Sequence, residues 1–274
     1  MDIKKEEFLR EYKLEEEYLI EQNIDWHIIE QIAKDYISYK TSYETQANLI
    51  ANILRGHPKV HSVKMRTKHE KHLIEKLIRK TSDRRKKYGE DFHFTLENYK
   101  DEITDLVGIR VIHIFKEDWE EIHNFITKMW KIIEIVANIR EGDNTRRFKE
   151  LNIEVCSRLS GYRSVHYLIE SYPTTEKVIT EIQVRTIFEE GYGEIDHQLR
   201  YSLDNIPEIL EQNLMLLNRI AGSSDEMASL INSLSQSFSK IEEHNYKMNL
   251  LQKEIKSNNT LTEEEKIKFL NIID

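Results

Sequence analysis

Glycine and proline are confined to the middle of this chain of 274 residues. All eight glycines and all three prolines lie between Gly56 and Gly222, so the first 55 and the last 52 residues contain neither. Proline breaks the interior of a helix and glycine weakens it, so both ends lack the residues that interrupt helices. We therefore expect helical arms at both ends and a different architecture between them.

Apolar residues in both arms recur at steps of three and four residues, which is typical of amphipathic helices. The stripe of the N-terminal arm is Leu19, Ile20, Ile24, Ile28, Ile32 and Tyr36. The stripe of the C-terminal arm is Met227, Leu230, Ile231, Leu234, Phe238, Ile241 and Tyr246. We expect these faces to pack around a core or to join subunits of a homo-oligomer.

The middle of the chain changes to strand patterns. A buried strand is predicted at Val107–Phe115, and helices are predicted at 117–131 and 187–201. Four further strand-like runs lie between those helices, at 132–139, 153–159, 164–172 and 177–185. Helices around a mixed sheet predict an α/β or α+β domain.

The simplest division of the chain has three parts. We expect an N-terminal helical arm over residues 1–58, a core over 59–203 and a C-terminal helical region over 204–274.

Composition excludes several classes of protein. One cysteine excludes an internal disulfide framework, and no apolar run approaches the roughly 18–20 residues of a membrane span. A net charge of −9 argues against wholesale binding to DNA or membranes. We expect a cytoplasmic protein.

Basic charge is concentrated in one segment. Between Lys59 and Lys87 there are twelve Lys and Arg residues against three Asp and Glu residues, a local charge of +9. Its last part, residues 84–87, fits a solvated helix face as well as a surface for a polyanion.

Four cations earlier in that segment can converge on one ligand. Arg66 and Lys68 are two apart in an extended stretch, and Lys76 and Arg79 follow three apart on a predicted helix. A nucleoside triphosphate is a natural ligand for such a group. Because no glycine-rich phosphate loop occurs, side chains would have to hold its phosphates.

Two carboxylates with apolar neighbours are candidates for a catalytic site. Asp105 opens the strand at Val107, and Glu181 lies inside the strand at 177–185. Phosphoryl chemistry needs a metal ion and therefore carboxylates. One acidic residue on a strand equally fits a solvent-facing position, but alternation places Glu181, Gln183 and Arg185 on one face. An acid, an amide and a guanidinium side by side favour a site.

The run Ser160-Gly-Tyr-Arg-Ser-Val-His166 follows a glycine turn. Tyr162, Arg163 and His166 could stack on a base and form hydrogen bonds with it. Taken alone, a tyrosine at a sheet edge and a surface histidine explain the run equally well.

Four segments stand in the order and with the internal spacing of one known family. They are KMRTKHEKHLIEKLIRK, ITDLVGIRVI, SGYRSVHYLI and EIQVRTIFEEGYGEIDHQLRY. From about Val60 to Tyr201 the chain resembles the synthetase domain of the RelA/SpoT family of alarmone synthetases, and specifically its small single-domain members. The resemblance implies a nucleotidyltransferase-like mixed sheet flanked by helices. It also implies transfer of pyrophosphate from ATP to the ribose 3′-hydroxyl of GDP or GTP, which yields (p)ppGpp and AMP.

The resemblance assigns roles on the ATP side. Arg66 and Arg110 would clamp the adenine, and Lys68, Lys76 and Arg79 would bind the phosphates.

On the acceptor side, the resemblance assigns the metal and the base. Asp105 would hold Mg²⁺ with the help of Glu181, and Glu181 would also accept the proton of the 3′-hydroxyl. The acceptor would be bound by Tyr162, which stacks on guanine, and by His166, Gln183 and Arg185.

The chain departs from the family pattern next to the acceptor. Small synthetases usually carry lysines and an asparagine before the GYRS motif, where this chain has Arg158 and Ser160. Three alternatives therefore stay open: a toxin-type enzyme that modifies the 3′-CCA end of tRNA and has an antitoxin partner, an enzyme with an adenine-nucleotide acceptor, and a non-catalytic nucleotide-binding scaffold.

Two observations rank these alternatives. A tRNA reader needs a basic surface, which residues 84–87 could supply, but the net charge and the acidic first 30 residues argue against it. Both Asp105 and Glu181 are retained, and binding alone requires no proton acceptor. We therefore expect a guanine nucleotide as acceptor. No adjacent His-Asp pair occurs, so we expect no activity of the family's hydrolase domain.

Overall fold

The structure is a computed structural model that describes residues 4–173, 176–202 and 206–273. The chain forms two compact units, Met1–Ser223 and Ser224–Asp274. The predicted boundaries of the arms and the core stay predictions, and the one at 203/204 lies outside the described residues.

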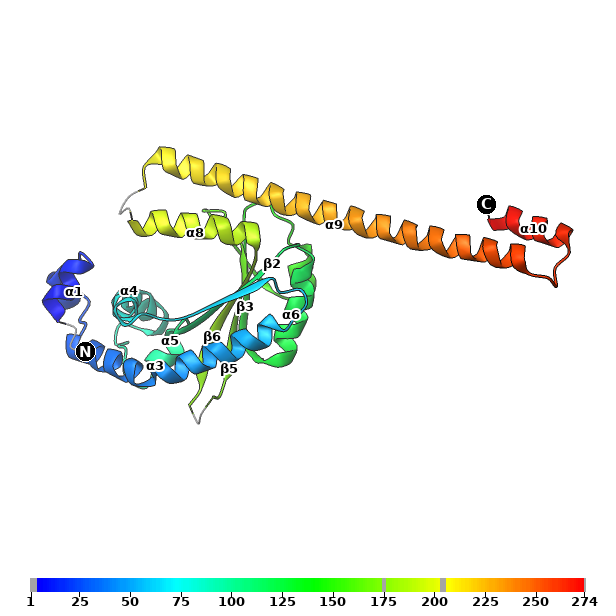
Figure 1. Cartoon of the computed structure of the whole chain (residues 1–274). Helices are drawn as coiled ribbons and strands as arrows, with labels where there is room; N and C mark the ends of the chain where they lie inside the picture. The colour runs from blue at the N-terminus through cyan, green and yellow to red at the C-terminus, as the bar shows by residue number, and fades with distance from the viewer. Residues whose placement is uncertain (1–3, 174–175, 203–205, 274) are drawn as a thin grey trace. The chain divides into compact units, whose positions relative to one another are not determined.

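A six-stranded mixed sheet forms the centre of the first unit, in the order β1-β2-β6-β5-β3-β4 (Figure 1). The β2–β6 and β3–β4 pairs are parallel, and the other three pairs are antiparallel. The strands are β1 (Ser62–Thr67), β2 (Val107–His113), β3 (Lys131–Ile139), β4 (Glu154–Ser157), β5 (Ser164–Ser171) and β6 (Val178–Thr186). The predicted strands and the α/β fold class are confirmed.

Eight helices and part of a ninth belong to the described residues of the first unit. They are α1 (Lys5–Glu11), α2 (Glu16–Glu21), α3 (Trp26–Arg55), α4 (Glu70–Tyr88), α5 (Tyr99–Glu102), α6 (Asp118–Met129), α7 (Arg146–Glu150), α8 (Ile187–Ser202) and the beginning of α9 (Glu208–Ser257). The helices predicted at 117–131 and 187–201 correspond to α6 and α8. In the described part of the chain, no helix is long and apolar enough to span a membrane.

The N-terminal arm is interrupted twice, so the expectation of one uninterrupted apolar stripe from Leu19 to Tyr36 is wrong. Asn23 has a positive φ of 40°, which asparagine tolerates better than most residues, and α2 ends before it. Asp25 then caps α3 by accepting a hydrogen bond from the His27 amide at 2.8 Å. Ile20 of the expected stripe is 72% exposed, whereas its neighbour Leu19 is buried.

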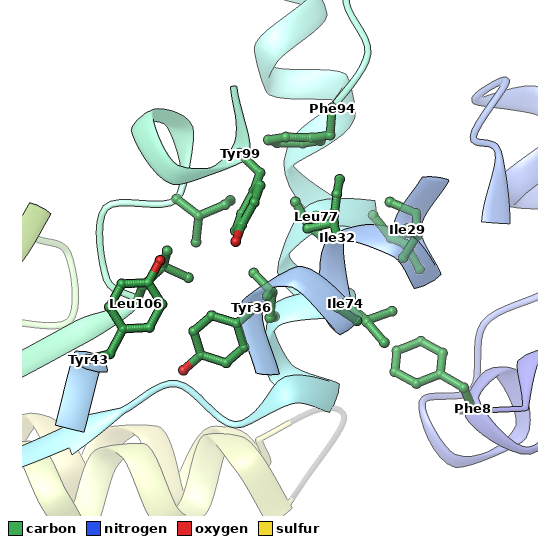
Figure 2. Packing of buried hydrophobic residues seen from close by; sticks show 14 of the residues in the cluster. Phe8, Ile29, Ile32, Tyr36, Tyr43, Ile74, Leu77, Phe94, Tyr99 and Leu106 are labelled. Atoms are coloured by element: carbon green, nitrogen blue, oxygen red, sulfur yellow. The ribbon is translucent and has the colours of Figure 1, made fainter. Parts of the chain in front are cut away.

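One core joins the N-terminal helices to α4. Figure 2 shows Tyr36 of α3, Ile74 and Leu77 of α4, and Tyr99 of α5 among the buried side chains that pack there. All four are fully buried. The Tyr36 hydroxyl also donates a hydrogen bond to the Lys68 carbonyl at 2.5 Å. The N-terminal arm therefore supports the segment that joins β1 to α4.

A second core lies on one face of the sheet, under α6 and the end of α3. It includes Ile109 of β2, Ile182 of β6 and Tyr167 of β5. The Tyr167 hydroxyl accepts a hydrogen bond from the indole of Trp119 on α6 at 3.0 Å. The alternate residues of β2 and β6 point to the other face of the sheet. That face remains available for a site.

The second unit contains the rest of α9 and α10 (Glu263–Ile273). The seven apolar residues of the predicted C-terminal stripe lie on α9, and every one of them is at least half exposed.

Candidate active site

The parallel pairing of β2 with β6 places the predicted site residues in adjacent rows. Gly108 of β2 pairs with Glu181 of β6, and Arg110 pairs with Gln183. On the other side of β2, Arg66 of β1 pairs with Gly108. A cavity of about 280 Å³ opens over these rows and is lined by Arg66, Arg110, Glu181, Gln183, Glu194 and His197 among others. The cavity therefore brings Arg66 and Arg110 together with Glu181 and Gln183.

Asp105 lies just before β2 and is held by two lysines. The Lys68 ammonium is 2.7 Å from one carboxylate oxygen, and the Lys76 ammonium is 2.9 Å from the other. The Lys68 amide also donates to the Leu106 carbonyl at 2.9 Å, which fixes the end of β1 beside Asp105. Burial would raise the pKa of Asp105, but the two lysines outweigh it and lower that pKa below its usual value. Asp105 is therefore a carboxylate at neutral pH.

Arg79, the fourth cation of the predicted phosphate-binding group, lies apart from this cluster. Its guanidinium pairs with Glu75 one turn earlier on α4, at 2.8 Å, and its side chain is 58% exposed. The structure thus brings together Lys68 and Lys76, while Arg66 lines the cavity.

Glu181 is held by two neighbours on the same face. The Gln183 amide donates to one carboxylate oxygen at 2.7 Å, and Nδ1 of His166 on β5 lies 3.3 Å from the other. Burial would raise the pKa of Glu181, but its interactions with His166 and Gln183 lower it below the usual value. Glu181 therefore carries the negative charge that a proton acceptor requires.

Tyr162 is placed between His166 and Arg185. Gly161 before it has a φ of 75°, a conformation that favours glycine. The Tyr162 hydroxyl lies 3.1 Å from Nε2 of His166 and accepts a hydrogen bond from Arg185 at 2.8 Å. The Arg185 guanidinium carbon lies 5.2 Å from the centre of the Tyr162 ring. Burial raises the pKa of Tyr162, so its hydroxyl stays protonated at neutral pH.

Two acidic residues of α8, which sequence reasoning missed, reach this face. Glu190 lies 3.4 Å from the Arg110 guanidinium, and Glu194 accepts a hydrogen bond from it. The two carboxylates are one helical turn apart on the helix that directly follows β6. The sequence showed that Glu190 and Glu194 are four residues apart on a predicted helix, which places both carboxylates on one helix face.

The basic run at 84–87 is partly structural. Arg84 pairs with Glu102 at 2.6 Å, and the buried Arg85 donates a hydrogen bond to the Phe92 carbonyl. Of the two interpretations left open for residues 84–87, a polyanion surface is therefore limited to Lys86 and Lys87, because Arg84 and Arg85 are used within the fold.

Asp105 and Glu181 can supply only part of the ligands that a metal ion needs. Asp105 lies close enough to Glu181 to raise its pKa, although this effect is smaller than that of His166. Among the residues that the structure describes, no group of three or more metal-binding side chains occurs. Mg²⁺ is commonly held by one or two carboxylates together with the oxygens of substrate phosphates. Asp105 and Glu181 fit that arrangement when a nucleotide supplies the remaining ligands.

We predict that Gly161→Ala disturbs the loop before Tyr162 more than Gly142→Ala disturbs its own loop. Both glycines have a positive φ, 75° and 87° respectively, so each substitution costs about 1–2 kcal/mol of backbone strain. A methyl group on Gly161 would also lie 2.7 Å from Oδ1 of the buried Asn218, whereas nothing lies within 4 Å of one on Gly142. Denaturant unfolding should show an additional loss of about 1–3 kcal/mol for Gly161→Ala. Equal losses would contradict the close packing of this loop against α9.

The chain is similar in sequence to a GTP pyrophosphokinase and in fold to a small alarmone synthetase. The chain is 27% identical over 210 residues to the GTP pyrophosphokinase YwaC of Bacillus subtilis, covering 74% of this chain and 88% of that protein. It shares the fold of the small alarmone synthetase 1 from Bacillus subtilis, with a TM-score of 0.58, 21% identity, and coverage of 74% of this chain and 98% of that one.

Two further crystal structures of that synthetase share the fold. The structure bound to its product pppGpp has a TM-score of 0.56, and the structure bound to AMPCPP has a TM-score of 0.55. Each is 21% identical and covers 74% of this chain and 99% of the synthetase. A family profile described as the region found in RelA / SpoT proteins matches residues 65–206, just over half of the chain. This protein therefore belongs to the RelA/SpoT family.

Proposed function

We propose that this protein transfers the β,γ-pyrophosphate of ATP to the ribose 3′-hydroxyl of GDP or GTP, which yields (p)ppGpp and AMP. One observation carries the proposal. Asp105, a carboxylate held by Lys68 and Lys76, lies near Glu181, a second carboxylate that contacts His166, which in turn contacts Tyr162. The first arrangement suits a triphosphate, and the second suits a nucleoside whose hydroxyl must lose a proton. The relative named GTP pyrophosphokinase and the synthetase solved with pppGpp and with AMPCPP support the same reaction.

On the ATP side, Lys68 and Lys76 bind the phosphates and Arg66 and Arg110 bind the adenine. The two lysines already converge within 3 Å of Asp105, so triphosphate oxygens can replace that carboxylate as their partner. The flat guanidinium groups of both arginines line the cavity and can stack on a base. Arg79 joins the phosphates once its side chain leaves Glu75.

The reaction breaks one bond and forms one. The acceptor 3′-oxygen attacks the β-phosphorus of ATP, and the bond from that phosphorus to the α,β-bridging oxygen breaks, so AMP leaves with the bridging oxygen. Glu181 takes the proton of the 3′-hydroxyl. Mg²⁺, held by Asp105 and Glu181, would neutralise charge on the phosphates. The lysines stabilise the same charge.

On the acceptor side, Tyr162 provides a surface for stacking. Arg185 lies over its ring, so the opposite ring face can receive a base, and stacking is worth roughly 1–3 kcal/mol per base. Stacking does not distinguish one base from another, so hydrogen bonds must select guanine. His166 contacts the Tyr162 hydroxyl and Gln183 accepts a hydrogen bond from Arg185, so both can supply polar groups for that selection.

The alternatives have less support. A tRNA reader would need an extended basic surface, and two of the four cations at 84–87 are used within the fold. A scaffold would not need the paired and ionised Glu181. Cytoplasmic location and an antitoxin partner stay predictions. So does a homo-oligomer formed through the exposed apolar face of α9, which sedimentation velocity can test.

Product analysis tests the proposed reaction. The purified protein, Mg²⁺ and γ-³²P-labelled ATP are incubated separately with GDP, GTP, ATP and tRNA, and the products are separated by chromatography. We expect the label in guanosine tetra- and pentaphosphate. Unlabelled AMP should form in an equal amount. Labelled tRNA without labelled guanine nucleotides would overturn the choice of acceptor, and no transfer to any acceptor would overturn the reaction.

We predict that Asp105→Asn and Glu181→Gln each remove most transfer activity. Each substitution keeps the size of the side chain and removes its charge, and loss of a general base costs roughly 100-fold or more in kcat. Asp83→Asn is the matched control, because Asp83 pairs with Lys80 on the surface of α4. Near-normal turnover of Asp105→Asn at saturating Mg²⁺ would contradict the assignment of Asp105 as a residue that holds the metal ion.

We predict that Lys76 keeps metal ions away from Asp105 in the absence of nucleotide. The Lys76 ammonium group, 2.9 Å from the Asp105 carboxylate, repels a metal cation that approaches the same carboxylate. Lys76→Met removes this repulsion and should strengthen Mn²⁺ binding by about 10-fold or more. Electron paramagnetic resonance measures free and bound Mn²⁺ directly. Arg79→Met is the control, because Arg79 pairs with Glu75 and its substitution should leave Mn²⁺ affinity unchanged. Equal Mn²⁺ affinities for Lys76→Met and the unmodified protein would refute the prediction.

A further inference from the structure

Glu190 is a buried carboxylate without a role in the reaction described above. It lies in the first turn of α8, and only 5% of its surface is exposed. Burying a carboxylate is costly unless cations and hydrogen bonds compensate for the lost water. The cations that compensate Glu190 indicate what it does.

Three cations from three different strands surround this carboxylate. The Lys64 ammonium of β1 lies 2.9 Å from it, the Arg110 guanidinium of β2 lies 3.4 Å from it, and the Arg185 guanidinium of β6 lies 3.2 Å from it. Burial would raise the pKa of Glu190, but the hydrogen bond from Lys64 and the charges of both arginines lower it. Glu190 is therefore ionised at neutral pH and joins β1, β2 and β6.

The two arginines serve different nucleotides. Arg110, which is assigned to the adenine of ATP, lines the cavity over β2 and β6, whereas Arg185 lies over the Tyr162 ring and donates to its hydroxyl. A guanidinium that bonds a carboxylate through its edge keeps its flat faces free for aromatic rings. One carboxylate thus contacts both arginines, because it accepts a hydrogen bond from Arg110 and forms an ion pair with Arg185.

Polar contacts continue from Arg185 to the proposed base. The Tyr162 hydroxyl contacts Nε2 of His166 at 3.1 Å, and Nδ1 of the same histidine contacts Glu181 at 3.3 Å. The contacts therefore run from Arg110 through Glu190, Arg185, Tyr162 and His166 to Glu181.

We propose that Glu190 is a positioning residue that sets both nucleotide sites at once, the ATP site through Arg110 and the acceptor site through Arg185. The inference rests on the proposed function, because that function assigns the two sites. Glu194 provides a natural comparison. It contacts Arg110, its side chain is 48% exposed, and among the described residues it forms no ion pair with Arg185.

Nucleotide binding to Glu190→Gln and Glu194→Gln tests the proposal. Isothermal titration calorimetry gives the dissociation constants of AMPCPP and GDP separately and does not depend on turnover. We expect Glu190→Gln to weaken both ligands by about 5-fold or more, which corresponds to about 1 kcal/mol each. Glu194→Gln should weaken AMPCPP and leave GDP unchanged. The surface substitution Glu120→Gln, which affects a carboxylate paired with Arg147, should change neither.

The possible results separate this inference from the proposed function. If the unmodified protein binds neither GDP nor GTP, the proposed acceptor is wrong. If it binds AMPCPP and either guanine nucleotide, and Glu190→Gln weakens only one of the two ligands or neither, the positioning role is wrong. Circular dichroism checks folding, and Glu190→Asp serves if Glu190→Gln unfolds. This variant keeps the charge but shortens its reach, and it should weaken both ligands by a smaller factor, whereas unchanged binding would again overturn the inference.

Discussion

The parallel pairing of β2 with β6 is the constraint on which the site depends. It sets Gly108 opposite Glu181 and Arg110 opposite Gln183, and the antiparallel partner β1 adds Arg66 to the same row. A shift of one residue would turn the side chains of β6 to the other face of the sheet and expose Ile182. The buried apolar face therefore fixes the register, and the register fixes which polar groups meet on the opposite face.

Each of three carboxylates of the site, the buried Glu190 and the half-buried Asp105 and Glu181, carries its own cations or donors. Asp105 has two lysines, Glu181 has a histidine and an amide, and Glu190 has a lysine and two arginines. Because an uncompensated buried charge would be expensive, ligand binding must exchange partners rather than add charge to an empty site. A triphosphate is suited to this exchange, because its oxygens replace a carboxylate in front of the same lysines.

Sequence patterns predicted the strands β2 to β6 and the main helices, whereas β1 was expected only as an extended stretch. Alternation in β6 was sufficient to place Glu181 beside Gln183, because a strand has only two faces. The partner of Arg79 was readable from the spacing, because Glu75 lies four residues earlier on the same helix and residues four apart on a helix are neighbours.

Other features depend on contacts that a sequence pattern does not reveal. The N-terminal arm breaks where Asn23 adopts a positive φ, and Arg84 and Arg85 are used by Glu102 and the Phe92 carbonyl. Glu190 was missed because two of its cations, Lys64 and Arg110, come from strands that are distant from it in the sequence.

A crystal structure with AMPCPP, Mg²⁺ and GDP tests the central claim most directly. We expect Lys68 and Lys76 to have left Asp105 for the phosphate oxygens, with the metal ion between Asp105, Glu181 and the nucleotide and the guanine against Tyr162. Both lysines still bound to Asp105, with AMPCPP outside the cavity over β2 and β6, would contradict it.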